Sequence, residues 1–385
     1  MEAEIDPTLA TMLAHDDFEG SGPIVPPIHQ TSLFAFESYA AMAAAFDGSR
    51  PQPIYSRGDN PTVMEFERKL AALEGAEAAR GFASGMGAIA ATVLSQVGAG
   101  ERIVCVRHVY PDAYRLFLKL LPRLGITVDF VDGRDLTAME QALDGAKLLY
   151  LESPTSIVFE TQNLSAIAAM AKARGVVTVI DNSWATPLFQ RPLAAGIDLV
   201  VHSASKYLSG HSDTVAGVVA GSKALIARIN DLTYPYLGAK LSPFDAWLLV
   251  RGMRTLPLRM QRHHTSGLAV ARRLAEHPAV TAVHHPGLRQ DRTTTGWSGL
   301  FSFEVAPSVD IPVLCDRLNL FRLGVSWGGH ESLVFPAQVG LVQAGPANAL
   351  VAFGVSPRLV RLHVGLEEPA DLIADLESAL TAAGG

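Results

Sequence analysis

The feature that most constrains this chain is an alternation between short, wholly apolar runs and segments with helical spacing. The apolar runs predict strands at 102–106, 127–131, 148–151, 176–180, 197–202 and 214–220. Helical spacing predicts helices at 61–74, 113–124, 136–143 and 164–173. Apolar strands that alternate with helices are typical of a mostly parallel sheet with helices on both faces. Ligands of such sheets bind beyond the carboxyl ends of the strands, so the residues that follow each strand are the first candidates for chemistry.

The chain divides into three parts by its local composition. Its 385 residues allow two or three packed units at about 150 residues per domain. Residues 1–58 are rich in proline, glycine and serine and are predicted to form an extended arm. Residues 59–245 carry the alternating pattern, and residues 246–385 carry long helices and a few strands, among them 300–305 and 359–364. We therefore predict an arm, a central α/β domain and a smaller C-terminal α+β domain.

Composition excludes several classes of partner. The 31 basic and 38 acidic residues give a net charge of −7 with no block of like charges, which argues against nucleic acid or an anionic membrane surface. No apolar run approaches the roughly 18 residues of a membrane span, and two distant cysteines allow no disulfide framework. We expect a cytoplasmic protein with a small-molecule ligand. With 49% apolar and only 18% charged residues, burial between subunits is also expected.

Two polar residues stand at neighbouring strand ends. Lys206 follows the predicted strand 197–202, where a desolvated amine has its pKa lowered enough to act as a nucleophile. Asp181 ends the preceding strand, so its carboxylate emerges at the same edge of the sheet. Taken separately, a surface lysine and a turn-capping aspartate are the simpler interpretations. A buried carboxylate needs a partner to stay ionised, and the lysine supplies one.

Three further elements fit the same edge. Residues 83–87, with Gly85 and Met86, open a helix and form a candidate anion site, although the same pattern is an ordinary helix cap. Tyr110 follows the strand 102–106, where an aromatic ring can stack on a planar ligand. Arg361 lies on the strand 359–364 and suits a carboxylate, unless that strand face is simply exposed. The glycines match neither GxGxxG nor GxxxxGK[ST], which disfavours a nucleotide-dependent oxidoreductase.

Together, these candidate residues point to one cofactor more specifically than any of them does alone. A lysine amine, a lone carboxylate, an anion cradle, a stacking aromatic and a carboxylate-binding arginine are what pyridoxal phosphate requires for amino-acid chemistry. A metal site is not expected. The adjacent pairs His263-His264 and His284-His285 lack the i, i+4 spacing of a helical zinc site and are interpreted as helix-end and loop histidines.

Over nearly its whole length the chain resembles the Cys/Met-metabolism family of pyridoxal-phosphate enzymes, which includes cystathionine lyases and synthases and methionine γ-lyase. Five blocks carry the resemblance: 55–62, 83–88, 181–187, 202–211 and 359–367. The resemblance implies the aspartate-aminotransferase fold, known as fold type I, with a mostly parallel seven-stranded central sheet and a smaller C-terminal domain. It also implies a homotetramer built from dimers.

The resemblance assigns roles to individual residues. It implies catalytic roles for three: Lys206 as the lysine that holds the cofactor covalently, Asp181 as partner of the ring nitrogen, and Tyr110 as the stacking ring. Cofactor-phosphate contacts are implied for Gly85, Met86, Ser203 and Ser205, with Tyr55 and Arg57 reaching across from a neighbouring subunit. Substrate contacts are implied for Arg361, Ser326, Trp327 and Ser156.

Within the family, the details favour the bacterial cystathionine β-lyase branch. The resemblance to that branch lies in Trp184 and in the runs 151–156 and 326–333. Two features differ from it: the run 55–61 resembles the γ-acting branch, and His330 stands where the β-lyases have an aromatic residue. The predicted reaction is β-elimination of L-cystathionine, or of cystine-like thioethers, to a thiol, pyruvate and ammonia in methionine metabolism. The alternative is a cystathionine γ-synthase, a γ-lyase or an O-acyl-homoserine sulfhydrylase of the same family.

Overall fold

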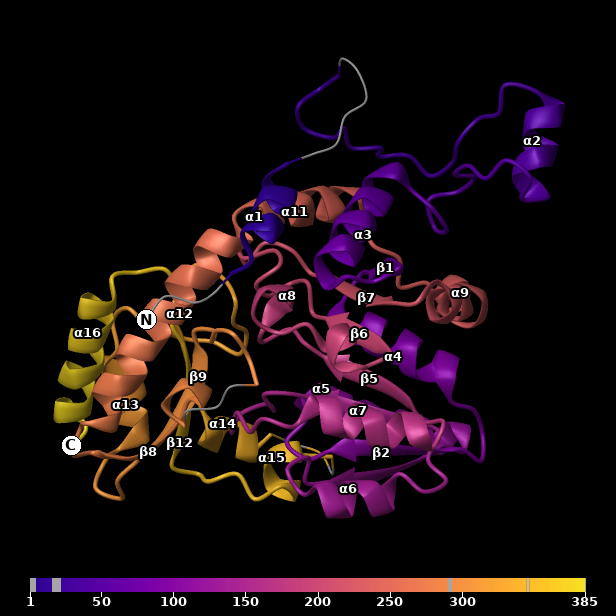
Figure 1. Ribbon diagram of the computed structural model, residues 1–385. Coiled ribbons are helices and arrows are strands. Elements are labelled where there is room, and N and C mark those ends of the chain that lie inside the picture. Colours follow the sequence, from indigo (N-terminus) through magenta and orange to yellow (C-terminus); the bar gives the residue numbers. More distant parts are fainter. Residues whose placement is uncertain (1–4, 16–21, 290–292, 344, 346, 385) are drawn as a thin grey trace.

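The computed structural model describes residues 5–15, 22–289, 293–343, 345 and 347–384 (Figure 1). The chain builds two sheets. The first lies in the centre of the sequence, and the second lies in the C-terminal third with the long helix α12 (Leu256–Ala275) and the last helix α16 (Pro369–Ala382) beside it. Among the described residues no helix is long and apolar enough to cross a membrane.

The larger sheet has seven strands in the order β1-β7-β6-β5-β4-β2-β3. Strands β2 to β6 run parallel to one another, and β7 pairs antiparallel with both β1 and β6. The predicted mostly parallel sheet is therefore confirmed. The strands are β1 Ala78–Phe82, β2 Arg102–Val106, β3 Thr127–Val131, β4 Leu148–Glu152, β5 Val177–Asp181, β6 Leu199–His202 and β7 Gly217–Gly221.

Alternate residues of the strands enter two different cores. In β2, Ile103 and Cys105 pack with α4, α5 and α9, whereas Val104 and Val106 pack on the opposite face with α6 and α7. This two-sided burial explains why the strands read as continuous apolar runs. The helical elements of this part are α3 Pro61–Glu74, α4 Gly85–Gln96, α5 Pro111–Arg115, η1 Leu116–Leu120, η2 Leu121–Leu124, α6 Leu136–Ala142, α7 Leu164–Ala173, α8 Thr186–Phe189, η3 Pro192–Ala195, α9 Lys223–Leu232 and α10 Tyr234–Leu237.

The smaller sheet has five strands in the order β10-β11-β12-β9-β8. All its pairs are antiparallel except β10 with β11. Its strands are β8 Val280–His284, β9 Leu300–Val305, β10 Arg322–Leu323, β11 Leu333–Pro336 and β12 Leu359–His363. The accompanying helical elements are α11 Pro243–Arg254, α12 Leu256–Ala275, η4 Pro286–Leu288, α13 Ile311–Arg317, α14 Ala337–Leu341, α15 Ala349–Ala352 and α16 Pro369–Ala382.

The N-terminal segment differs from the predicted extended arm in containing two helices. Helix α1 (Pro7–Ala14) buries Leu9 and Leu13 and packs against α3 and α11 of its own chain. Helix α2 (Tyr39–Phe46) buries no residue and projects away from the body in Figure 1. The boundaries 1–58, 59–245 and 246–385 remain predictions.

Two other local features depart from expectation. Strand β1 was not predicted, because Ala-Ala-Arg-Gly-Phe has low strand propensity; its Arg80 is buried and paired with Glu67 and Asp59. The interpretation of His263 and His264 as helix-end residues is wrong. Both are buried in the middle of α12, and His263 Nδ1 lies 2.9 Å from the carbonyl oxygen of Val364.

Candidate active site

A cavity of about 790 Å³ lies at the carboxyl ends of β4, β5 and β6. Its other wall comes from the segment after β10, from α14 and from β12. Eleven residues predicted for the site line this cavity, from strand ends, loops and the start of α4: Gly85, Met86, Tyr110, Ser156, Asp181, Ser203, Ser205, Lys206, Ser326, Trp327 and Arg361.

Lys206 lines the cavity and is held by contacts with the loop between β10 and β11. Its Nζ donates a 2.8 Å hydrogen bond to Ser326 Oγ and lies 5.6 Å from the centre of the Trp327 ring. Burial, and next the charge of Arg361, lower the pKa of Lys206 below its ordinary value, while Asp181 opposes this shift. A lowered pKa increases the neutral, nucleophilic fraction of the amine.

Asp181 belongs to a short hydrogen-bond relay. Ser183 donates to Asp181 Oδ1 from both its backbone N–H, at 2.9 Å, and its hydroxyl, at 2.6 Å. The backbone N–H of Ser203 donates to Ser183 Oγ at 2.7 Å. Burial raises the pKa of the Asp181 carboxyl, whereas the Ser183 bonds and the charges of His202 and Lys206 lower it. The relay fixes the carboxylate's orientation before any ligand arrives.

The start of α4 forms the candidate anion cradle. Ser84 caps the helix by accepting the N–H of Gly87 at 3.0 Å, and Gly85 and Met86 follow in the first turn, where N–H groups have no intrahelical partner. A Cβ on Gly85 would lie 2.9 Å from both Cβ and Oγ of Ser203. Ser205 is fixed nearby, since its hydroxyl bonds the backbone of Ala216 in both directions. These residues fit a phosphate group, because the first-turn N–H groups of α4 lie beside the Ser203 hydroxyl where glycine allows close approach.

Tyr110 stands at the N-cap of α5 on the cavity wall. Its hydroxyl donates to Asp112 Oδ2 at 2.9 Å, and its backbone N–H donates to Glu152 Oε2 at 2.7 Å. Burial, and then the Asp112 carboxylate, raise the pKa of the phenol well above its ordinary value. The phenol is therefore neutral at physiological pH. Its stacking on a cofactor ring remains a prediction.

Glu152 is a cavity residue that sequence reasoning missed. It ends β4 as Asp181 ends β5, and it is only 8% exposed. Its Oε1 accepts the hydroxyl of Ser156 at 2.6 Å, so one carboxyl fixes both Ser156 and the backbone of Tyr110. Burial and the nearby Asp181 raise the pKa of Glu152. The rule that selected Asp181, a polar residue directly after an apolar strand, would have found Glu152 as well.

Arg361 enters the cavity from β12. Its Nη2 donates to the carbonyl oxygens of Val325 at 2.8 Å and Ser326 at 3.3 Å, and its guanidinium carbon lies 5.1 Å from the centre of the Phe335 ring. Burial lowers the pKa of Arg361 to about 10, which still leaves it cationic at neutral pH. A buried guanidinium with remaining donors is suited to bind a substrate carboxylate.

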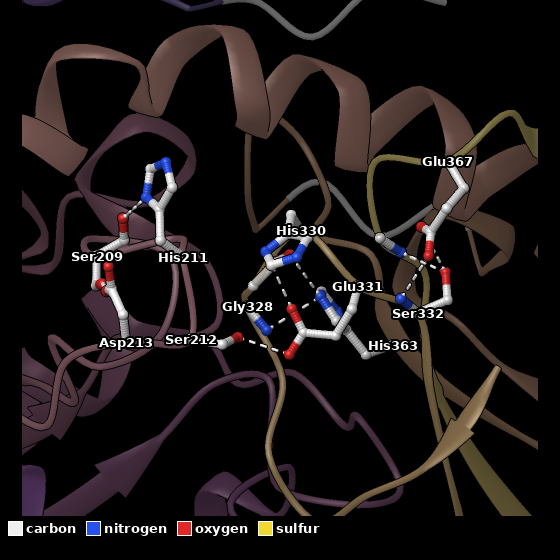
Figure 2. Close-up of polar contacts among 12 residues, drawn as sticks. Ser209, His211, Ser212, Asp213, Gly328, His330, Glu331, Ser332, His363 and Glu367 are labelled. Carbon is white, nitrogen blue, oxygen red and sulfur yellow. Dashed lines mark hydrogen bonds and ion pairs between the residues drawn. The ribbon is translucent and has the colours of Figure 1, made fainter. Parts of the chain in front are cut away.

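The loop between β10 and β11 brings Ser326 to Lys206 and depends on a glycine. Gly328 has φ of 87°. A Cβ at Gly328 would lie 2.8 Å from the backbone nitrogen of Tyr207. Figure 2 shows how the loop is tied down: Gly328 N–H donates to His363 Nε2 at 3.1 Å, and Ser212 donates to Glu331 Oε1 at 2.6 Å. His330 is not among the lining residues, and its side chain is 64% exposed.

Tyr55 and Arg57 do not line the cavity of their own chain. Tyr55 is 47% exposed, and the guanidinium carbon of Arg57 lies 5.5 Å from the centre of the Tyr55 ring. Among the described residues no group of three or more His, Cys, Asp or Glu side chains is arranged to hold a metal ion.

The fold and the cavity together define a class of protein, the fold type I enzymes that use pyridoxal phosphate. Within that class, the chain belongs to the family described as "Cys/Met metabolism PLP-dependent enzyme", whose model matches residues 9–381. The expected family, fold and cofactor are thus confirmed.

The relatives carry different activities. The chain is 39% identical to an L-methionine gamma-lyase of Pseudomonas putida, covering 98% of both chains, and 36% identical to a cystathionine beta-lyase of Lactococcus lactis subsp. cremoris, covering 94% of both. A cystathionine gamma synthase structure from Xanthomonas oryzae pv. oryzae, in complex with aminoacrylate and cysteine, matches with a TM-score of 0.90 at 32% identity, covering 98% of this chain and 97% of that one. The comparisons therefore support a lyase or transferase of sulfur amino-acid metabolism, dependent on pyridoxal phosphate.

Proposed function

We propose that this protein is a carbon–sulfur lyase that cleaves L-cystathionine by β-elimination to homocysteine, pyruvate and ammonia, with cystine-like thioethers as further substrates. One observation supports the choice of L-cystathionine as the substrate: charged side chains other than Lys206 and Arg361 also line the cavity. Arg115 and Glu331 are also lining residues, in a cavity of about 790 Å³. L-Cystathionine bears an ammonium and a carboxylate at each end, so it can use both sets of charges.

Pyridoxal phosphate, when bound, supplies an electron sink for the negative charge that develops at the substrate's Cα. Gly85, Met86, Ser203 and Ser205 would hold its phosphate, and Asp181 would keep its ring nitrogen protonated. Tyr110 would cover the ring. Arg361, with Ser326, Trp327 and Ser156 around it, would bind and orient the α-carboxylate.

Lys206 performs the proton transfer in this proposal. Its neutral amine removes the proton from Cα as general base, so the Cα–H bond breaks and Nζ becomes an ammonium. The Cβ–S bond then breaks, and its electron pair leaves with sulfur as a thiolate, which takes up a proton. The released enamine is hydrolysed to pyruvate and ammonia. The hydrogen bond from Lys206 Nζ to Ser326 Oγ supports this role, because it orients the amine within the cavity.

The keto acid formed from L-cystathionine tests the proposal directly. We expect pyruvate and homocysteine, because β-elimination leaves three carbons on the fragment that carried the reacting amine. An assay with lactate dehydrogenase, checked by chromatography, identifies the product. Arg115→Ala should raise KM for L-cystathionine by about tenfold, the effect of losing one charge-assisted bond, and should change KM for S-methyl-L-cysteine much less. Formation of 2-oxobutyrate, or equal effects of Arg115→Ala on both substrates, would contradict the proposal.

The second candidate is γ-chemistry, as a methionine or cystathionine γ-lyase, a cystathionine γ-synthase or an O-acyl-homoserine sulfhydrylase. The 39% identity to an L-methionine gamma-lyase favours it. A γ-lyase would release 2-oxobutyrate from L-cystathionine or L-methionine, and the synthase or sulfhydrylase would consume an activated homoserine.

We further propose that the chain acts as a homotetramer, a dimer of dimers in which Tyr55 and Arg57 complete the phosphate site of a neighbouring subunit. Exposed apolar side chains on the N-terminal segment support this assembly, since Ile24 is 82%, Tyr39 90% and Phe46 65% exposed. A second copy of this chain would cover them.

Mixing inactive variants tests the shared site. Arg57→Ala and Lys206→Ala chains should each be impaired alone, and together they should regain about a quarter of wild-type activity, because random pairing gives half mixed dimers with one intact site each. Mixing Asp181→Ala with Lys206→Ala is the matched control and should restore nothing, since both residues belong to one chain's cavity. Absence of recovery in the Arg57 mixture would show that Arg57 does not act across the interface.

A further inference from the structure

Glu152 has a buried carboxyl group in the catalytic cavity that the proposed reaction does not use. The residue ends β4, and in the register of the two parallel strands it pairs with Asp181 at the end of β5. A buried carboxyl group costs free energy unless hydrogen bonds satisfy it. The partners of this carboxyl therefore indicate what it does.

Both oxygens of the carboxyl group are bonded to residues of the proposed site. Oε2 accepts the backbone N–H of Tyr110 at 2.7 Å, and Oε1 accepts the hydroxyl of Ser156 at 2.6 Å. Burial, and next the charge of Asp181, raise the pKa of Glu152 to about 8. Protonation would preserve both bonds, because a hydroxyl group can also accept, and a protonated Oε1 can therefore donate to Ser156 Oγ. The two contacts do not depend on the charge of Glu152.

Tyr110 is held at its backbone by Glu152 and at its ring hydroxyl by Asp112. It is the N-cap of α5, a helix of only five residues, and its hydroxyl donates to Asp112 Oδ2 at 2.9 Å. With both ends fixed, the ring has little freedom to tilt. Without the Glu152 carboxyl, the N–H of Tyr110 would lose its acceptor. The orientation of the Tyr110 ring therefore depends on Glu152.

Ser156 begins a stretch of strained backbone. Ile157 and Phe159 have φ of 71° and 52°, in the left-handed region that residues other than glycine rarely adopt. Such a conformation persists where surrounding contacts impose it. Ser302 of β9 donates its hydroxyl to the carbonyl oxygen of Ile157, and Glu152 holds the Ser156 hydroxyl. The direction of the Ser156 hydroxyl therefore also depends on Glu152.

We propose that Glu152 is a positioning residue of the active site, which aligns Tyr110 against the cofactor ring and Ser156 against the substrate carboxylate by hydrogen bonding and not by charge. This role rests on the proposed functions of Tyr110 and Ser156. It does not depend on whether elimination occurs at Cβ or Cγ, because the cofactor ring and the α-carboxylate are common to both reactions.

Two dissociation constants measure the two contacts separately. The constant of pyridoxal phosphate for the apoenzyme reports on Tyr110. The constant of L-norleucine for the holoenzyme, read from the visible absorption spectrum, reports on Ser156, and this amino acid has no sulfur leaving group. Glu152→Ala should raise both constants by about tenfold, the effect of losing one buried hydrogen bond in each case. Glu152→Gln should keep both within about threefold of the wild type, because its carboxamide can accept from Tyr110 and donate to Ser156.

Ser156→Ala completes a double-mutant cycle. Alone it should raise the L-norleucine constant by about tenfold and leave the pyridoxal phosphate constant unchanged. When Glu152→Ala is added, the L-norleucine constant should rise by no more than about a further twofold, because that contact is already lost. The pyridoxal phosphate constant should still rise by about tenfold.

Glu160→Ala is the matched control. Glu160 lies in the same loop, pairs with Arg134 at 2.8 Å and does not line the cavity, so both constants should stay unchanged.

The proposal is overturned if a folded Glu152→Ala protein binds both ligands as the wild type does. It is also overturned if Glu152→Gln weakens either ligand by tenfold or more, since charge would then be required, and this second outcome decides the question even if Glu152→Ala fails to fold. Formation of 2-oxobutyrate from L-cystathionine would contradict the proposed β-elimination but would leave these dissociation constants as expected.

Discussion

Replacing Lys206 with alanine should leave a folded protein that forms no covalent bond to pyridoxal phosphate and has lost at least about 10³-fold in turnover, since the general base and the covalent attachment disappear together. Lys206 Nζ donates one hydrogen bond, to Ser326, so its removal should change the stability of the fold little. Borohydride reduction followed by peptide mapping should find a pyridoxyl group on the peptide around residue 206 in the wild type and none in the variant.

The matched control is Lys147→Ala. The Lys147 side chain is 47% exposed and does not line the cavity. The variant should therefore keep both the visible absorption of the bound cofactor and the turnover of the wild type. Circular dichroism and size-exclusion chromatography of the two variants separate lost chemistry from lost folding. A Lys206→Ala protein that still turns over its best substrate would refute the assignment of the nucleophile, and with it the proposed mechanism.

Asp181→Ala should lower kcat by roughly 10²–10³-fold, the usual cost of removing one preorganised electrostatic partner. The phosphate cradle at α4 and the amine of Lys206 stay in place, so the variant should still bind cofactor, although more weakly. Ser183→Ala should cause a smaller loss, because it removes the hydroxyl that holds Asp181 Oδ1 but leaves the carboxylate. Steady-state kinetics together with cofactor titration distinguish these effects.

Asp198→Asn provides the control for Asp181. Asp198 accepts two hydrogen bonds from Thr178 next to the start of β6, at the opposite end of the sheet from the cavity. Its replacement should lower stability slightly and leave kcat unchanged. If Asp181→Ala also kept its full rate, the argument that a ring-nitrogen partner stabilises the developing charge would fail.

The large sheet and its strand-end residues were predictable because they depend on local patterns. A wholly apolar strand signals two-sided burial, and the residue after it must lie at the sheet edge, which places Asp181 and Lys206 in one cavity. Strand β1 was not predicted, because its residues form no apolar run. Its Arg80 can be buried because it is paired with Glu67 and Asp59. The two helices of the N-terminal segment were not predicted, because the sequence around them is rich in proline and glycine.

Contacts between distant segments could not be derived from spacing. The bond between Lys206 and Ser326 joins residues 120 positions apart, and the catalytic cavity brings Asp181 and Arg361 together from strands of two different sheets. Glu152 could have been found with the rule applied to Asp181. The local patterns do not settle the choice between β- and γ-elimination, because runs that resemble each branch occur in this one chain and relatives with both kinds of activity match it at similar identity.

Asp181 ends β5 of the seven-stranded sheet, with Lys206 and the start of α4 beside it, whereas Arg361 lies on β12 of the five-stranded sheet, with Ser326 and Trp327 in the loop after β10. The two walls touch where Ser326 bonds Lys206 and where Gly328 packs on the backbone of Tyr207, so a change in that loop also moves the reactive amine. Val339 and Val342, at and just after α14, line the cavity from the same wall and make neither contact. A protein engineer who wants a new substrate would therefore randomise these two positions first.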